Sequence, residues 1–222
     1  MSEELTAATE FLDYEHPDVR AFVARAVPDR TVSLTEQTTQ LYYAVRDGID
    51  YEVYGVDMSR DGLRASTIVR NGRGFCVHKS ILFAAAVRAI GVPGRLLVAD
   101  VRNHLASERL KSLVGGEVFV HWLTEVRLEG RWVKATPVFN KLLCRLYRMT
   151  PLEFDGTHDS LHQPYDESAG QHMEFLRWHG TFDDVAYDEL IAIMASRHPG
   201  MFPEGDTAVP GTGSLRDEAP VG

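Results

Sequence analysis

The chain has 222 residues, of which 44% are hydrophobic and 25% charged, an ordinary composition for a globular protein with one sizeable domain. Its 23 Lys and Arg against 32 Asp and Glu give a net charge of −9 at pH 7, which argues against general nucleic-acid binding and against adhesion to anionic membranes. Two cysteines, Cys76 and Cys144, are too few for a disulfide framework or a thiolate zinc site.

The sequence also argues against a membrane or secreted protein. Acidic residues stand at the start, where a signal peptide has basic ones, and the longest apolar run, residues 81–87, is far shorter than the ~20 residues that span a bilayer. We therefore expect a cytoplasmic protein. Residues 1–10 and 201–222 lack a periodic apolar pattern and are expected to be flexible tails around a single domain, residues 11–200.

The first half of the chain predicts helices. Pro17 suits a first helical turn, and Ser33 or Thr35 can cap a second helix. Residues 76–90 are apolar on nearly all sides, which indicates a helix buried in the core. The predicted helices cover residues 17–28, 33–48, 62–70 and 76–90.

The period then changes to that of strands. Strands are predicted over residues 95–101, 118–128 and 131–136, with Glu129-Gly130 as the turn of a hairpin. The chain beyond Pro137 is loop-rich, apart from a last helix near residues 185–197. Helices followed by a meander of strands predict an α+β fold, with the buried helix packed on an antiparallel sheet.

Cys76 stands where the glycine-rich turn 71–74 meets the start of the buried helix. Backbone N–H groups and the helix dipole favour an anion at such a position, which would lower the pKa of the thiol and could also stabilise an oxyanion. Gly74 in this turn is a candidate contact for substrate. A free cysteine can equally be a small buried hydrophobe, and position by itself leaves both interpretations open.

A nucleophilic cysteine needs a base. His78 is only two residues from Cys76 and points to a different side of the helix, so His121 in the strand 118–128 is the better candidate. A histidine among apolar neighbours needs a partner, which could also be a nearby backbone group. Trp122 beside it could line a substrate groove or pack in the core.

The hairpin suggests a third position. A two-residue turn places Thr136 diagonal to His121 on the same face of the sheet, whereas a bulge would move Thr136 to the other face. The turn also makes Glu125 and Lys134 a cross-strand ion pair. The register pairs Leu128 with Arg131, Glu125 with Lys134, and Leu123 with Thr136.

Three segments carry a resemblance. The run R-N-G-R-G-F-C-V-H-K-S-I-L-F-A-A-A-V-R-A-I-G-V-P-G-R resembles the nucleophile motif of the transglutaminase-like superfamily. The run V-H-W-L-T-E-V-R-L-E-G-R-W-V resembles the family's histidine strand and hairpin, and D-G-I-D-Y-E resembles the stretch before the nucleophile. The resemblance covers about residues 35–140. It implies a papain-like α+β fold with Cys76 as nucleophile and His121 as general base.

One position departs from the family pattern. The family strand reads Trp-Val-x-x-Asp-Pro, and its Asp orients the histidine, whereas this chain has Thr136 there, which looks like a bacterial branch. A hydroxyl can accept a hydrogen bond from the imidazole but supplies no negative charge for an imidazolium. Asn140 and Asp155 are alternative residues for orienting His121.

Histidine and aspartate crowd the segment 155–172, and both are metal ligands. No tight metal motif is present, so we expect a polar loop near the cleft, in which Asp155 and His158 contact substrate. His104 lies in a second loop, residues 102–116, that could cover the site. The residues of the cluster are Asp155, His158, Asp159, His162, Asp166 and His172.

The sequence therefore favours a thiol enzyme that needs no cofactor and forms an acyl-enzyme on Cys76. Its substrate would be a peptide, a protein or an acyl thioester, and water or an amine would release the product. One alternative is a catalytically inactive binding domain on the same scaffold, because Thr136 replaces the family Asp. Another is a metal-dependent protein that uses the 155–172 cluster. The oligomeric state is left open.

Overall fold

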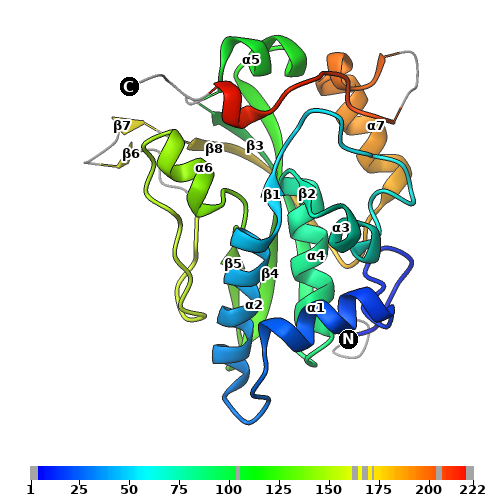
Figure 1. Cartoon of the computed structure of the whole chain (residues 1–222), viewed down its shortest axis with the longest axis vertical. Coiled ribbons are helices and arrows are strands. Elements are labelled where there is room, and N and C mark those ends of the chain that lie inside the picture. The colour runs from blue at the N-terminus through cyan, green and yellow to red at the C-terminus, as the bar shows by residue number, and fades with distance from the viewer. Residues whose placement is uncertain are drawn as a thin grey trace.

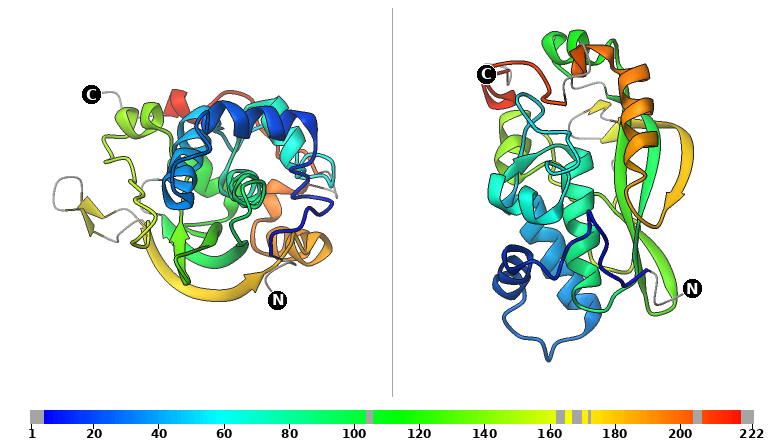
Figure 2. Two further views of the ribbon diagram at one scale, coloured as in Figure 1. Left: turned by 90° about the horizontal axis from the view of Figure 1, so that it is seen from below. Right: turned by 90° about the vertical axis from the view of Figure 1, so that its right-hand side faces the viewer.

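The computed structural model describes residues 5–103, 106–161, 165–166, 170–171, 173–203 and 207–218. A layer of helices packs on one side of a curved antiparallel sheet (Figure 1, Figure 2), which confirms the predicted α+β class. The helices are α1 (Pro17–Ala26), α2 (Leu34–Gly48), α3 (Ala65–Asn71), α4 (Cys76–Arg88), α5 (Glu108–Val114), α6 (Lys141–Leu146) and α7 (Tyr187–Arg197), with 3-10 helices η1 (Pro199–Met201) and η3 (Leu215–Glu218). The strands are β1 (Asp50–Tyr51), β2 (Arg73–Gly74), β3 (Gly94–Asn103), β4 (Val118–Leu128), β5 (Arg131–Ala135), β6 (Tyr165–Asp166), β7 (Gly170–Gln171) and β8 (Met173–Phe182).

The main sheet has the order β5-β4-β3-β8, with every neighbouring pair antiparallel. Glu129 and Gly130 have φ angles of 49° and 81°, the left-handed conformation of a two-residue hairpin turn between β4 and β5. Leu128 pairs with Arg131 as predicted. The ladder ends where Ala135 pairs with Thr124, so β4 extends beyond β5 at its N-terminal half.

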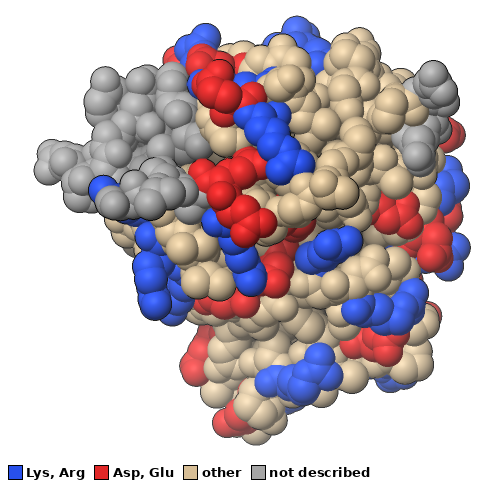
Figure 3. Space-filling model, turned by 45° about the horizontal axis from the view of Figure 1, so that its top comes forward, with Lys and Arg blue, Asp and Glu red and all other residues tan. Residues whose placement is uncertain are grey.

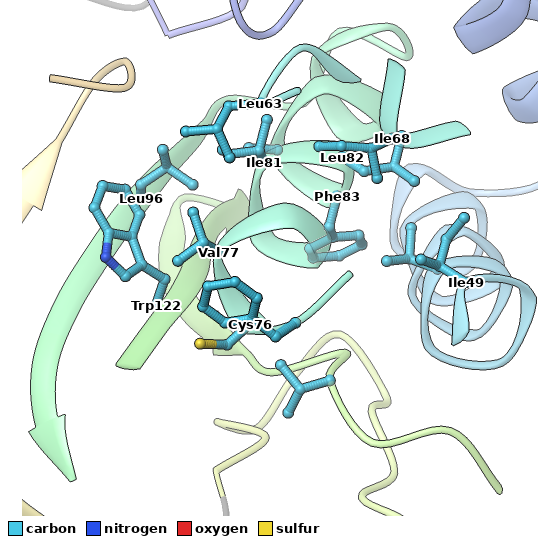
Figure 4. Packing of buried hydrophobic residues seen from close by; sticks show 14 of the residues in the cluster. Ile49, Leu63, Ile68, Cys76, Val77, Ile81, Leu82, Phe83, Leu96 and Trp122 are labelled. Carbon is cyan, nitrogen blue, oxygen red and sulfur yellow. The ribbon is translucent and has the colours of Figure 1, made fainter. Parts of the chain in front are cut away.

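Helix α4 forms the centre of the core. All 13 of its residues are buried, because its side chains are apolar on nearly every side. Figure 4 shows Phe83 directed toward α2 and the Ile49 side of the core, and Val77 directed toward Trp122 of the sheet. The helix is therefore enclosed between the other helices and β4.

The polar side chains of α4 are also buried, and each is bound to backbone. Lys79 Nζ donates to the carbonyl oxygens of Arg46 and Ile49, at 2.8 and 2.7 Å, where α2 ends. Arg88 donates to the carbonyl oxygens of Gly94 and Ala7. Burial lowers the pKa of Lys79 to about 7. These bonds fix the position of α4 relative to the chain segments around it.

The elements that were not predicted include α5, α6 and β8. Strand β8 pairs with β3 with register shifts next to Val98 and Asp100, so its side chains do not alternate regularly between the faces. It is also an edge strand with several exposed residues. Its sequence therefore lacks the alternation of apolar and polar residues that predicts a strand.

The two ends of the described chain pack on the domain. The carbonyl oxygen of Leu5 accepts a hydrogen bond from Gly94 N at 3.1 Å. Near the other end, Val209 and Leu215 are buried, and Ala208 forms a bridge with Asp57. These contacts involve single residues spaced along loops, so they leave no periodic pattern in the sequence. No helix within the described residues combines the length and the apolar character that crossing a membrane requires.

Candidate active site

The segment before α4 sets the position of Cys76. Gly72 ends α3 with a φ angle of 62°, and β2 then pairs in parallel with β1. A Cβ atom on Gly74 would lie 2.5 Å from the Cβ of His78, so only glycine fits at this point. Cys76 is the first residue of α4, as the glycine-rich turn predicts.

The start of α4 covers the part of β4 that β5 leaves unpaired. Ser80 Oγ donates to the carbonyl oxygen of Trp122 at 3.0 Å, and Thr124 Oγ1 donates to the carbonyl oxygen of Ser80 at 3.1 Å. Farther along this edge, Val120 N donates to His198 Nε2 at 3.0 Å. Because β5 ends early, this edge of β4 is open to other segments. The α4 N-terminus and the segment after α7 both contact it.

His198 was not predicted as part of this region. Its Nδ1 donates to the carbonyl oxygen of Val114 at 2.8 Å while Nε2 accepts from Val120, so both ring nitrogens are bound to backbone. Burial lowers the pKa of His198, which keeps the ring neutral. We assign it the structural role of holding α7 and η1 against β4.

The thiol of Cys76 is in two opposing environments. Backbone N–H groups of Trp122, Val77 and Cys76 face the sulfur and favour the thiolate, as expected at a helix N-terminus. Burial has the larger effect and raises the pKa of Cys76 to about 11, so the lowered pKa that the sequence analysis expects is wrong. The thiol is therefore protonated in the absence of substrate.

Cys76 and His121 line the same pocket. Both side chains are buried, with 5% and 4% of their surface exposed. In Figure 4 the sulfur of Cys76 points out of the packed cluster. The His121 ring meets that of Phe175 edge to face, with 6.1 Å between centroids. The empty space of the pocket, including the solvent at its mouth, is about 470 Å³.

The wall of this pocket includes residues that the sequence analysis missed. Tyr51 of β1 and Asn103 of β3 line it. Burial raises the pKa of Tyr51, and a thiolate at Cys76 raises it further. The phenol is therefore close enough to the sulfur for their charges to interact. Tyr51 belongs to the D-G-I-D-Y-E segment, so the resemblance pointed to this stretch without assigning a role to the tyrosine.

Thr136 does not make the predicted hydrogen bond to His121. Its side chain is 1% exposed, and Oγ1 has no hydrogen-bond partner among the described residues. The residue follows the end of β5, and its carbonyl oxygen accepts from Tyr42 Oη at 3.1 Å. The ladder register was predicted correctly, but the strand ends one residue before Thr136.

Asn140 has a structural role instead of orienting His121. Its Oδ1 accepts from Leu143 N at 3.0 Å, which caps α6, and its Nδ2 donates to Asp50 Oδ1 at 3.1 Å. Asn140 does not line the pocket. Trp122 is likewise a packing residue, because its ring is 2% exposed and stacks on Phe182 with 6.0 Å between centroids.

The structure places Asp155 and His158 away from the pocket. Asp155 Oδ2 and His158 Nδ1 are 2.7 Å apart, and both side chains are exposed. The adjoining Gly156 packs against Leu128 at the hairpin turn, about 20 Å along β4 from His121. They are therefore not placed to contact a substrate at Cys76, and Asp155 is not placed to orient His121.

The predicted metal cluster is only partly described. Asp159 is bound to Lys134, with 3.2 Å between Oδ2 and Nζ. Within the described part of the chain, no group of three or more metal-ligating side chains comes together. The side chains of His162, Asp166 and His172 and the whole of His104 lie outside the described residues.

Charged residues of both signs are mixed on the surface. Figure 3 shows Lys and Arg interspersed with Asp and Glu on the face that it presents, without a broad patch of one sign. The predicted pair of Glu125 and Lys134 is present at 3.6 Å, and Arg95 shares the same carboxylate at 2.7 Å.

Comparison with known families agrees with this geometry. Residues 20–137, just over half of the chain, match the transglutaminase-like superfamily. The chain belongs to this superfamily. The match includes Cys76 and His121 and the position of Thr136, and it ends at Pro137. No curated protein matches the chain.

Solved structures of similar shape include two bacterial proteins. A candidate cysteine protease from Cytophaga hutchinsonii has a TM-score of 0.46 and 12% identity, over 79% of this chain and 53% of that one. A candidate protease from Parabacteroides distasonis has a TM-score of 0.37 and 15% identity, over 60% of this chain and 26% of that one. The chain thus spans about half of the first protein and about a quarter of the second.

Proposed function

We propose that the protein is a thiol enzyme of the transglutaminase-like superfamily that acts on an amide or thioester carbonyl. The observation that carries this proposal is the shared pocket at the unpaired edge of β4, which both Cys76 and His121 line. A nucleophile and a base facing one pocket are the minimum set for acyl transfer through a covalent intermediate. Peptides, proteins and acyl thioesters are the proposed substrates.

In the proposed reaction Cys76 attacks as a neutral thiol. His121 takes the thiol proton while the sulfur–carbon bond forms, and then gives that proton to the leaving amine or thiolate as the bond from carbon to the leaving group breaks. Water or an amine next attacks the acyl-enzyme, with His121 as base, and frees Cys76. Backbone N–H groups at the start of α4 are the proposed donors to the oxyanion.

A non-catalytic binding domain is the second candidate, because two observations favour it. Burial raises the pKa of Cys76 to about 11, which disfavours a reactive thiolate. The sequence resemblance predicts the family Asp at the position of Thr136, whose hydroxyl forms no hydrogen bond within the described residues. Such a domain would keep the pocket and its ligand but not form a covalent intermediate.

Intact-protein mass spectrometry distinguishes the two candidates. We expect wild-type protein mixed with an activated ester, p-nitrophenyl butyrate, to gain one acyl group, which peptide mapping places on Cys76. His121→Gln should slow the acylation by about 100-fold or more, because general-base assistance is lost. The matched control is Cys144→Ala, at a buried cysteine outside the pocket, which should be acylated at the wild-type rate.

Two results would contradict the enzyme. One is acylation that proceeds equally in Cys76→Ala, and the other is a rate at Cys76 that His121→Gln leaves unchanged. Either result would favour the binding domain. Circular dichroism on each variant checks that the fold is retained.

A further inference from the structure

A second cavity adjoins the pocket of Cys76 and His121. Its empty space, including the solvent at its mouth, is about 380 Å³, and it shares Tyr51, Asn103 and Leu110 with the first pocket. Leu143 of α6 and Leu215 of η3 line the parts of the second cavity that the first one does not share. The two cavities are therefore neighbouring compartments that share part of one wall.

Both compartments are apolar and uncharged. Among the described residues that line them there is no Asp, Glu, Lys or Arg. Methionine is frequent instead, with Met173, Met194 and Met201 in the first compartment and Met149 in the second. A charged group without a partner would lose its hydration there at a large cost in free energy, whereas methionine adapts to apolar groups of different shape.

We propose that Cys76 accepts its acyl group from donors with an uncharged, extended, apolar acyl chain. This inference rests on the proposed function and names the substrate class of that site. The carbonyl carbon lies at Cys76, the first carbons of the chain occupy the first compartment, and a longer chain passes Leu110 into the second. The sulfur–carbon bond replaces the bond to the leaving group, which departs with the proton from the thiol.

The C-terminal part of the described chain contributes Leu215 to the wall of the second compartment. Leu215 is 4% exposed, and its backbone is bound on both sides. Its N–H donates to Glu52 Oε2 at 3.2 Å, and its carbonyl oxygen accepts from Tyr147 Oη at 2.8 Å. In this proposal the anchored Leu215 is the fixed end of the acyl site, so the site selects acyl chains by length as well as by charge.

Acylation of wild-type protein by a series of p-nitrophenyl esters tests the proposal. We expect octanoate to acylate Cys76 at least about tenfold faster than butyrate, because each buried methylene favours binding. A chain of the same length that ends in a carboxylate should react at least about tenfold more slowly than octanoate. Equal rates for the charged and the apolar chain would overturn the proposal.

Two substitutions locate the chain within the compartments. Leu143→Trp fills the second compartment, so it should lower the ratio of the decanoate rate to the butyrate rate about tenfold. Leu110→Asp introduces a charge at the shared wall and should remove the preference for long chains. Leu34→Asp, at a leucine 49% exposed in the first turn of α2, is the matched control and should keep it. If Leu143→Trp slows both esters equally, or neither, the assignment of the second compartment is wrong.

A binding measurement separates this inference from the proposed function. Octanamide, which lacks an activated leaving group, is titrated by calorimetry into Cys76→Ala, which cannot be acylated at this position. If wild-type protein is acylated by no ester, the enzyme fails, and the titration then decides the apolar site by itself. Octanamide bound at least about tenfold more tightly than butanamide supports the site, and equal or absent binding overturns it.

Discussion

Thr136 stands where the sequence resemblance predicts an Asp in the superfamily pattern. A carboxylate at this position would carry negative charge into the buried region next to the hairpin, whereas threonine carries none. Its hydroxyl is buried and has no hydrogen-bond partner among the described residues. The neutral side chain agrees with a neutral thiol at Cys76, since no buried anion is present at this position to stabilise an imidazolium.

Replacement of Thr136 by valine tests whether this hydroxyl has a role. We expect Thr136→Val to raise the free energy of unfolding by about 1 kcal/mol, because an unbonded buried hydroxyl is replaced by a methyl group. The measurement is urea denaturation, together with the acylation rate of Cys76, which should not change. Thr124→Val is the matched control. The Thr124 hydroxyl donates to Ser80, so its loss should cost about 1 kcal/mol. A destabilised or inactive Thr136→Val would show that Thr136 has a partner.

At the scale of elements, helix α4 connects the site to the rest of the fold. The same helix carries Cys76 at its first residue and buried polar side chains along its length. His78 Nε2 donates to the carbonyl oxygen of Asp57 at 3.0 Å, which joins the helix to the loop between β1 and α3. Burial lowers the pKa of His78 to about 4. Protonation of His78 is therefore expected to affect the position of α4, the helix that carries Cys76.

This pKa predicts a pH dependence of stability. In the folded state His78 stays neutral down to about pH 4, whereas in the unfolded chain it takes up a proton near pH 6.5. The unfolded state binds more protons between these values, so stability is present above pH 6.5 and is lost as the pH falls to 4, by up to about 3 kcal/mol.

The measurement is urea denaturation across this pH range for wild type and His78→Gln, which keeps an N–H donor but does not titrate. The difference in the free energy of unfolding between the two proteins should shrink as the pH falls, because only the wild type contains His78. Carboxylates that titrate in the same range affect both proteins equally and cancel in this difference. A constant difference across the range would contradict the lowered pKa of His78.

At the scale of the whole molecule, segments far apart in sequence close the site. Glu52, next to Tyr51 in the wall of the pocket, accepts hydrogen bonds from Val53 N and Tyr54 N through Oε1 and from Leu215 N through Oε2. A buried carboxylate thus joins β1 to η3. Together with the hydrogen bond from Tyr147 Oη to the carbonyl oxygen of Leu215, this contact holds Leu215 at the wall of the second compartment.

Glu52→Gln tests that connection. An amide has one acceptor oxygen and cannot serve donors on both sides, so we expect the free energy of unfolding to fall by about 1–3 kcal/mol. Limited proteolysis should cut residues 207–218 faster than in wild type, since the segment loses its anchor. Glu15→Gln, at an exposed glutamate, provides the control. Unchanged cleavage in Glu52→Gln would show that other contacts hold the segment.

The amino-acid sequence by itself determined the features that depend on near neighbours in the chain. The apolar run of α4, the cap at Ser33 and the two-residue turn at Glu129 each predict an element from local periodicity or backbone conformation. Cys76 and His121 were likewise found from the sequence, because each lies in an element, α4 or β4, that the local pattern predicts.

Only the tertiary structure decided the features that depend on distant parts of the chain. The pKa of Cys76 follows from the burial of the thiol, which outweighs the local effect of the helix N-terminus. Contacts between distant segments likewise decide the capping role of Asn140, the exposed position of His158 and the anchored position of Leu215. Local periodicity does not report such contacts. Burial and long-range contacts arise when the whole chain packs, and for that reason they were beyond the reach of the sequence analysis.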